Sequence, residues 1–265
     1  MSSAITPTAS LPVTESRPLP ALGGFNLTAL TLEIRRMLRN RRTVMFIVVF
    51  PSLFFFMFRT SGGGRGTNAG IIQAYVLISM AVYGAMVGTT AGGAAVAVER
   101  SLGWSRQLRL TPLRPAAYIA MKVLTAMVLG LVAVISAFAV GALSGVRMAP
   151  NVWLLAGLAA WGSSLVFAAF GLFMGFLLPS ENVMQFVGPM LAILAMGGGL
   201  FVPLQNLPPL MRRIATLSPA YGVGVISRAP LIGGLSAAAI SSVVVWTAIF
   251  GVGAMLLFRR DTARV

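Results

Sequence analysis

The sequence predicts an all-α membrane protein, and three observations lead to that fold class. Hydrophobic residues make up 57% of the 265 residues, and charged residues only 9%, against about 25% in typical soluble domains. The mean hydropathy is +0.90. Several apolar runs exceed the roughly 18 residues that mark a membrane-spanning helix. A chain of this composition is expected to be a multi-pass protein of the cell membrane.

The first 25 residues are expected to form a disordered cytoplasmic tail. They carry proline at positions 7, 12, 18 and 20, and they lack the basic start and apolar core of a secretory signal. The remaining residues, 26–265, are expected to form one transmembrane domain.

An amphipathic helix is expected over roughly 27–42, with Asn26 as its N-cap. Leucine, isoleucine and methionine recur on one side at helical spacing. Such a helix lies in the membrane interface with its charged side toward the lipid headgroups. A solvated lead-in to the first span is the alternative. The charged residues singled out on this helix are Glu33, Arg35, Arg36 and Arg39.

Six transmembrane helices are expected after the interface helix. The first is short and contains Pro51, whereas the second is long enough to project beyond a hydrocarbon core of about 30 Å. Residues 179–182 form a tight turn between the fourth and fifth. The six spans are expected at about 43–58, 71–98, 123–143, 152–178, 183–203 and 236–258.

Glycines at four-residue spacing mark the second and fourth spans, and they predict closely packed helices. A contact between subunits is the alternative. The glycines are Gly84, Gly88 and Gly92 on the second span, and Gly171 and Gly175 on the fourth.

The segment between the last two spans, 204–235, is too apolar for a solvated loop and too rich in proline for a span. Irregular backbone at membrane depth must be covered by protein or line a cavity. Short re-entrant helices are therefore expected between spans five and six, with an ordinary extracellular loop as the alternative.

The distribution of cations predicts that both termini are cytoplasmic. With the N-terminus inside, the cytoplasmic segments hold 14 of the 20 cations and the outer segments hold 6, as the positive-inside rule requires. The net charge of +15 does not predict nucleic-acid binding, because the cations lie at the ends of apolar runs and not on one polar face.

The composition excludes most catalytic chemistry. The chain has no cysteine and no histidine, which removes thiol nucleophiles, Cys-ligated metals and the commonest general base. Its five acids lie in the tail or at predicted span ends, whereas an ion-coupled carrier needs an ionisable residue inside the membrane. The phosphate-binding pattern GxxxxGK[ST] is missing. We expect no enzyme activity, no metal and no cofactor in this chain, so energy for uphill transport must come from a partner.

The cytoplasmic stretch ERSLGWSRQLRLTPLRPAAYIAMK, residues 99–122, concentrates charge and is the expected contact with that partner. Gly103 permits a sharp bend, and the residues after it form one or two helical turns that end before Pro112. A short rigid helix between two spans suits force transfer, and a basic anchor on anionic lipid is the alternative. The expected coupling residues are Glu99, Arg100, Gly103, Trp104, Arg106, Gln107, Leu108, Arg109, Thr111 and Pro112.

The pattern ER-x-x-G-x-x-x-QL-x-x-TPL in this loop resembles the loop pattern of ABC-2 type transporter permeases. The form GWSRQLRLTPL is similar to the one in the drug-exporter branch of that family, which includes daunorubicin-type efflux permeases. Arg106 departs from the pattern, because many members carry an acid there. The proline-rich stretch before the last span resembles the family as well. The matching residues in that re-entrant segment include Pro203, Pro208, Pro219 and Tyr221.

The resemblance implies the fold and the partners of a transporter. Two permease copies, identical or paralogous, would join two separate ATP-binding subunits that hold ATP and Mg. Closure of those subunits would push on a coupling helix at about 101–110 and open a path outward for a hydrophobic, drug-like or lipidic substrate. A membrane scaffold or sensor that docks a cytoplasmic protein without transport is the alternative, and a secondary carrier comes third.

Overall fold

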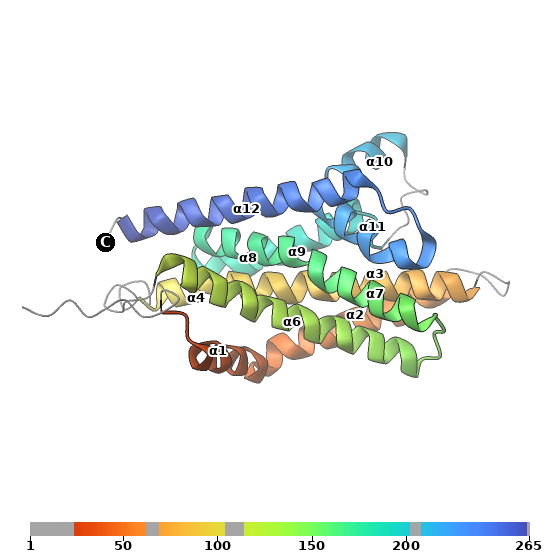
Figure 1. Ribbon diagram of the computed structural model, residues 1–265, viewed down its shortest axis with the longest axis horizontal. Helices are drawn as coiled ribbons and strands as arrows, with labels where there is room; N and C mark the ends of the chain where they lie inside the picture. Colours follow the sequence, from red (N-terminus) through yellow and green to blue (C-terminus); the bar gives the residue numbers. More distant parts are fainter. Residues whose placement is uncertain (1–23, 62–68, 104–113, 202–207, 264–265) are drawn as a thin grey trace, which may run out of the picture.

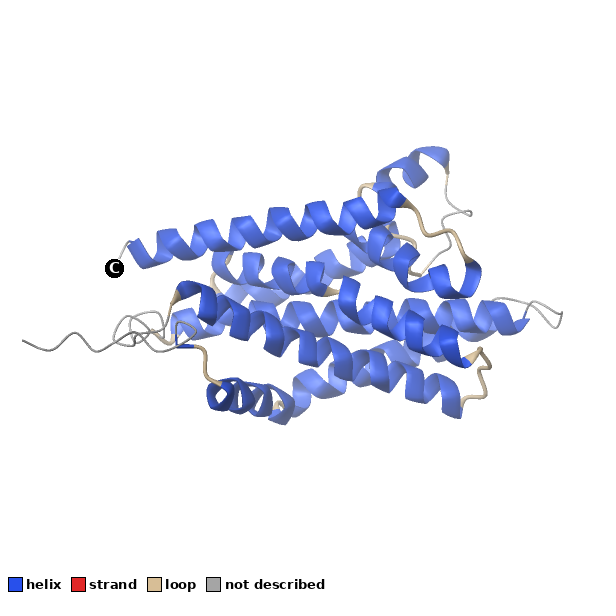
Figure 2. Cartoon of the chain, viewed as in Figure 1, coloured by secondary structure: helices blue, strands red, loops and turns tan. Residues whose placement is uncertain are grey.

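The computed structural model describes residues 24–61, 69–103, 114–201 and 208–263, and all regular structure in these ranges is helical (Figures 1 and 2). The long helices lie side by side in a bundle, with α1 at one end and the α10–α11 pair at the other. The helices are α1 Leu27–Arg39, α2 Arg41–Ser61, α3 Ala69–Ala94, α4 Val96–Ser101, α6 Pro115–Leu143, α7 Pro150–Ser163, α8 Leu165–Leu177, α9 Ser180–Gly197, α10 Pro209–Thr216, α11 Pro219–Ile232 and α12 Ala237–Ala263.

Five helical segments of the described residues are long and apolar enough to cross a membrane. Two of them are interrupted, since α3 and α4 meet at Ala95, and α7 and α8 meet at Ser164. The five segments are Arg41–Arg59, Ala69–Ser101, Ala116–Leu143, Pro150–Leu177 and Ala237–Asp261. They confirm an all-α chain with several spanning helices and correspond to five of the six expected spans.

Helix α9 occupies the position of the remaining expected span, 183–203, but the predicted end is wrong. The helix stops at Gly197, and Gly199 adopts a positive φ of 76°, a conformation that glycine reaches without steric cost. The polar residues Ser180–Asn182 in its first turn lower its hydropathy. Composition alone therefore does not class α9 with the five spanning segments.

Two other predicted boundaries are wrong as well. The N-terminal helix begins as expected, because the Asn26 side chain accepts a hydrogen bond from the Thr28 N–H at 2.8 Å. It ends at Arg39 and not at residue 42, since the chain turns at Asn40. The third span begins at Pro115 and not at 123, with proline in the first turn where its missing N–H costs nothing. Lys122 consequently lies inside α6.

The glycine pattern is confirmed as helix packing within the chain. A Cβ atom at Gly88 would lie 3.1 Å from the carbonyl oxygen of Leu129 on α6, and one at Gly92 only 2.6 Å from the Ala126 Cα. On the other side of α3, a Cβ at Gly171 of α8 would lie 2.3 Å from the carbonyl oxygen of Thr90. These glycines let α3 run between α6 and α8 with backbone almost touching backbone.

The segment after α9 is helical where it is described. Helix α10 is capped by Pro208, and α11 begins at Pro219. Helix α11 packs into the bundle through Arg228, which is only 3% exposed. One guanidinium nitrogen of Arg228 donates to Ser79 Oγ and to the Gly199 carbonyl, both at 3.0 Å. The segment is therefore tied to α3 and to the end of α9.

Candidate functional site

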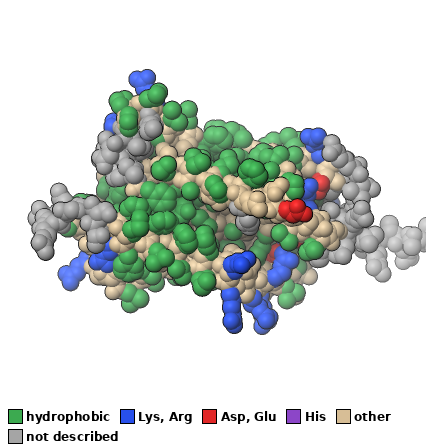
Figure 3. Space-filling model, turned by 180° about the vertical axis from the view of Figure 1, so that it is seen from behind, with side chains coloured by type: hydrophobic (Ala, Val, Ile, Leu, Met, Phe, Trp, Pro, Cys, Tyr) green, Lys and Arg blue, Asp and Glu red, His purple; other side chains and the backbone are tan. Residues whose placement is uncertain are grey.

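Charged side chains of three helices meet at the end of the bundle where α1, α4 and α6 come together. Glu33 and Arg36 lie one turn apart on α1, Glu99 lies on α4, and Tyr118 and Lys122 lie one turn apart on α6. We call these five residues the charged junction. The view in Figure 3 shows hydrophobic side chains over the middle of the molecule and the visible acids near one end.

Lys122 is the centre of the charged junction. Its ammonium group donates to Glu33 Oε1 at 2.7 Å and also to Glu99 Oε1. The side chains of Lys122 and Glu99 are only 5% and 7% exposed. A buried ion pair is stable only when each charge is compensated by close partners, and both charges meet that condition here.

Glu99 is held by three donors from two other helices. Besides Lys122, the Arg36 guanidinium donates to Oε1, and the Tyr118 hydroxyl donates to Oε2 at 2.9 Å. Arg36 also bonds Glu33 at 2.7 Å on its own helix. Burial opposes the charge of Arg36, but its bond to Glu99 and the nearby Glu33 outweigh burial and raise its pKa. Two carboxylates and two cations thus form a neutral, cross-linked cluster.

The next residue, Arg100, connects α4 to two more helices. Its guanidinium forms a two-pronged bond with Asp261 of α12, at 2.8 and 2.9 Å. Another nitrogen donates to the carbonyls of Gly175 and Phe176, at 3.0 and 2.9 Å. Those carbonyls lie in the last turn of α8, where helical carbonyls lack partners. Adjacent residues of α4 therefore bind α1 and α6 on one side, and α8 and α12 on the other.

This arrangement suits mechanical linkage better than catalysis. The described residues contain no group of three metal-ligating side chains, and each charge of the junction is already paired. Gly103 follows α4 with a φ of 76°, which turns the chain into residues 104–113. Through Glu99 and Arg100, α4 is bonded to four other helices, namely α1, α6, α8 and α12.

The structure brings together residues that the sequence assigned to separate elements. Arg36 of the predicted interface helix bonds Glu99 of the predicted coupling loop, and Glu33 is joined to Glu99 through Lys122. Arg35 and Arg39 are exposed and form no ion pair with the part of the chain that is described. Pro208, Pro219 and Tyr221 lie in the α10–α11 region at the other end. The predicted residues outside the described ranges are Trp104, Arg106, Gln107, Leu108, Arg109, Thr111, Pro112 and Pro203.

The sequence interpretation missed three charged residues with specific contacts. Lys122 was placed at the end of a loop, and Asp261 and Arg228 were given no role. For two of the three residues rarity was the available signal, because Lys122 is the single lysine and Asp261 the single aspartate of the chain. A charged residue next to a long apolar run has to find a partner, which marks such residues for attention.

Replacing Arg100 with lysine is expected to loosen the end of α12. A lysine ammonium cannot reproduce the two-pronged bond to Asp261 together with the bonds to the α8 carbonyls. We expect a loss of about 1.5–3 kcal/mol at this contact, seen as faster tryptic cleavage after Arg259 or Arg260 in the purified protein. The control is Arg260→Lys, which alters an exposed cation and keeps the cleavage site. Equal cleavage rates for the two variants would contradict the role of Arg100.

Comparison with known proteins adds a family to this geometry. The sequence model of the family described as "ABC-2 type transporter" matches residues 26–230. A Bacillus subtilis (strain 168) protein named "Putative transport permease YvfS" is 27% identical over 194 residues, covering 72% of this chain and 79% of that protein. The region matched by the family model includes all five residues of the charged junction, and it ends before Asp261 on α12.

Proposed function

Because the chain belongs to the ABC-2 type transporter family, we propose that it is the membrane permease subunit of an ATP-driven exporter. Permeases of this family generally work with an ATP-binding subunit. The proposed cargo is a hydrophobic, drug-like or lipidic compound taken from the cytoplasm or the inner leaflet. The similarity of GWSRQLRLTPL to daunorubicin-type efflux permeases supports this class of cargo.

The charged junction is the observation that carries the proposal. Its residues Glu99 and Lys122 lie on the two helices that precede and follow residues 104–113, the segment proposed to receive the push of the ATP-binding subunit. Glu99 and Arg100 belong to the same helical segment as α3, which runs through the centre of the bundle between α6 and α8. Force applied at 104–113 is therefore proposed to reach the central span and α1, α6, α8 and α12 together.

The proposed topology has six spans, with α9 as the fifth. Helix α9 has 18 residues, a length of about 27 Å, which is close to the thickness of a hydrocarbon core. We further propose that α1 lies in the membrane interface, that α10 and α11 are re-entrant, and that both termini face the cytoplasm. The 14 cations on the proposed inner side, against 6 outside, support this orientation in the cell membrane.

The proposed assembly contains two ATP-binding subunits, which hold ATP and Mg, and a second permease, either a copy or a paralogue. The apolar surfaces of α2 and α12 leave room for such neighbours or for lipid, because only 17% and 6% of their apolar windows are buried within this chain. Residues 26–265 form the transmembrane domain in this proposal.

The test requires a P-loop ATPase, sought among the genes beside that of the permease, and a complex of the two proteins reconstituted in vesicles. We expect the permease to stimulate ATP hydrolysis and ATP to drive accumulation of a fluorescent anthracycline such as daunorubicin. Trp104→Ala and Arg109→Glu are expected to abolish the stimulation while the permease stays folded. Arg147→Gln, at the opposite end of the bundle, is the control.

Two outcomes would count against the proposal. If Trp104→Ala and Arg109→Glu bind and stimulate like the parent, residues 104–113 are not the coupling element. If the complex forms but no hydrophobic probe accumulates with ATP, a scaffold or sensor that docks a cytoplasmic protein becomes the better explanation.

A further inference from the structure

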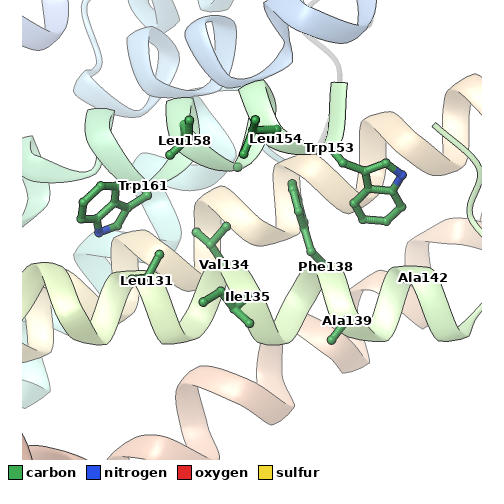
Figure 4. Close-up of a pocket in the computed structure, with 11 residues that line it drawn as sticks. Leu131, Val134, Ile135, Phe138, Ala139, Ala142, Trp153, Leu154, Leu158 and Trp161 are labelled. Atoms are coloured by element: carbon green, nitrogen blue, oxygen red, sulfur yellow. The ribbon is translucent and has the colours of Figure 1, made fainter. Parts of the chain in front are cut away.

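An apolar groove runs along the outer surface of α6 and α7 (Figure 4). It has a volume of about 420 Å³, within the range of pockets that bind small molecules. Trp153 and Trp161 of α7 stand at its two ends, and aliphatic side chains of both helices line the space between them. Leu154 and Leu158 on one wall and Ile135 on the other are more than half exposed.

The groove offers no polar group to a ligand. The Trp161 indole N–H already donates to the Met127 carbonyl at 2.9 Å. Trp153 packs at its edge against the ring of Phe138, with the ring centroids 5.1 Å apart. Because the tryptophans are fixed by these contacts, the groove is preformed and suits an apolar chain.

The position of the groove limits what can fill it. Both walls belong to segments that are long and apolar enough to span a membrane, Ala116–Leu143 and Pro150–Leu177. A groove at this depth opens into hydrocarbon, where a lipid acyl chain or another apolar helix is available.

A cation lies at the end of the groove that is marked by Trp153. The connection from α6 to α7 packs Val146 and Met148 against the same cluster as Trp153, whereas Arg147 between them is exposed. Arg59 also reaches this connection and donates to the Ser144 carbonyl at 3.5 Å. In a membrane, cations and tryptophans at the end of a span lie at the level of the lipid headgroups.

The charges favour a lipid over a second copy of the chain. The acids of the described residues, Glu33, Glu99, Glu181 and Asp261, all lie at or near the end of the bundle with the charged junction. A second copy placed side by side would therefore bring only cations toward Arg147. A phospholipid phosphate supplies the anion that the described residues do not offer at this end of the bundle.

We propose that the groove between α6 and α7 binds one acyl chain of an anionic phospholipid whose headgroup is held by Arg147. The lipid belongs to the leaflet opposite the charged junction. This site is independent of the transported compound and of the ATP-binding partner, and it would be retained in a permease that transports nothing.

Tryptophan fluorescence tests this site directly, because two of the four tryptophans line it. With Trp104 and Trp246 replaced by phenylalanine, Trp153 and Trp161 report on the groove alone. The protein is reconstituted in phosphatidylcholine vesicles with a minor fraction of lipid brominated on its acyl chains. We expect brominated phosphatidylglycerol to quench with about fivefold higher apparent affinity than brominated phosphatidylcholine, the effect of one cation near the headgroups.

Matched variants separate the site from ordinary lipid contact. Arg147→Gln is expected to abolish the preference for phosphatidylglycerol, whereas Arg213→Gln on α10 keeps it. Ala139→Phe, which fills the groove, is expected to reduce quenching by both lipids. A protein with Trp246 as its only tryptophan is expected to follow the mole fraction of brominated lipid without preference.

Either of two results would overturn the proposal. Quenching of the groove tryptophans in simple proportion to mole fraction, for both headgroups and independently of Arg147, would mean that the groove holds only bulk lipid. Absence of quenching even in vesicles made entirely of brominated lipid would mean that protein, such as a second copy, covers the groove.

Discussion

Replacing Lys122 with methionine is expected to destabilise the protein by about 3–5 kcal/mol, the cost of leaving a buried charge without its partner. Lys122 is the cation that joins Glu33 of α1 to Glu99 of α4, and its side chain is 5% exposed. Without it, two carboxylates share the single guanidinium of Arg36. In detergent, we expect the unfolding temperature to fall by on the order of 10 °C.

The reason for this loss can be checked with a double variant. Adding Glu99→Gln to Lys122→Met removes the unpaired carboxylate, so we expect part of the stability to return and the two changes to be non-additive. The control is Arg35→Met, which removes an exposed cation of α1 that forms no ion pair among the described residues. If Lys122→Met is no worse than Arg35→Met, the junction does not hold these helices together.

Replacing Gly171 with alanine is expected to separate α3 from α8. The added Cβ would lie 2.3 Å from the Thr90 carbonyl oxygen and 2.9 Å from its Cα. These are backbone atoms inside the helical segment Ala69–Ser101, so no side-chain rotation relieves the clash. Inserting a methyl group into such a contact costs about 1–3 kcal/mol and sometimes more. We expect a lower unfolding temperature and less folded protein on size-exclusion chromatography.

The same substitution at an open position provides the control. A Cβ at Gly251 on α12 would meet no atom within 4 Å, and alanine is a better helix former than glycine by about 1 kcal/mol. Gly251→Ala is therefore expected to leave the protein as stable as the parent or slightly more stable. Similar losses at Gly171 and Gly251 would show that the α3–α8 contact is looser than described.

Parts of the fold that depend on local sequence were predictable. The length of the hydrophobic runs predicted the spans, and the glycine spacing on α3 and on α8 predicted close helix packing. Each of these signals lies within a single helix. The Asn26 cap was predictable for the same reason. The wrong boundaries, at Asn40 and Gly197, are places where hydropathy stays high or charge continues while the backbone turns.

The candidate site was predictable only in part. The pattern around Glu99 and Arg100 predicted a coupling element from residues that are close in sequence, and this stays a prediction. Their partners are remote, since Lys122 bonds Glu33 across 89 positions and Arg100 bonds Asp261 across 161. Nothing local to those positions specifies which acid meets which cation.

The amino-acid sequence alone is enough to recognise a helical membrane protein of the ABC-2 type and to show that the pattern GxxxxGK[ST] is missing. Composition and sequence motifs are properties of residues that lie close together in the chain. Such residues also lie close together in the fold, so no tertiary contact is needed to recognise them. The packing of the bundle was needed to see that Glu33, Arg36, Glu99 and Lys122 form one neutral cluster, in which Lys122 and Glu99 are buried. Buried charges in such a chain must be paired, but which helices supply the pairs depends on how the bundle packs.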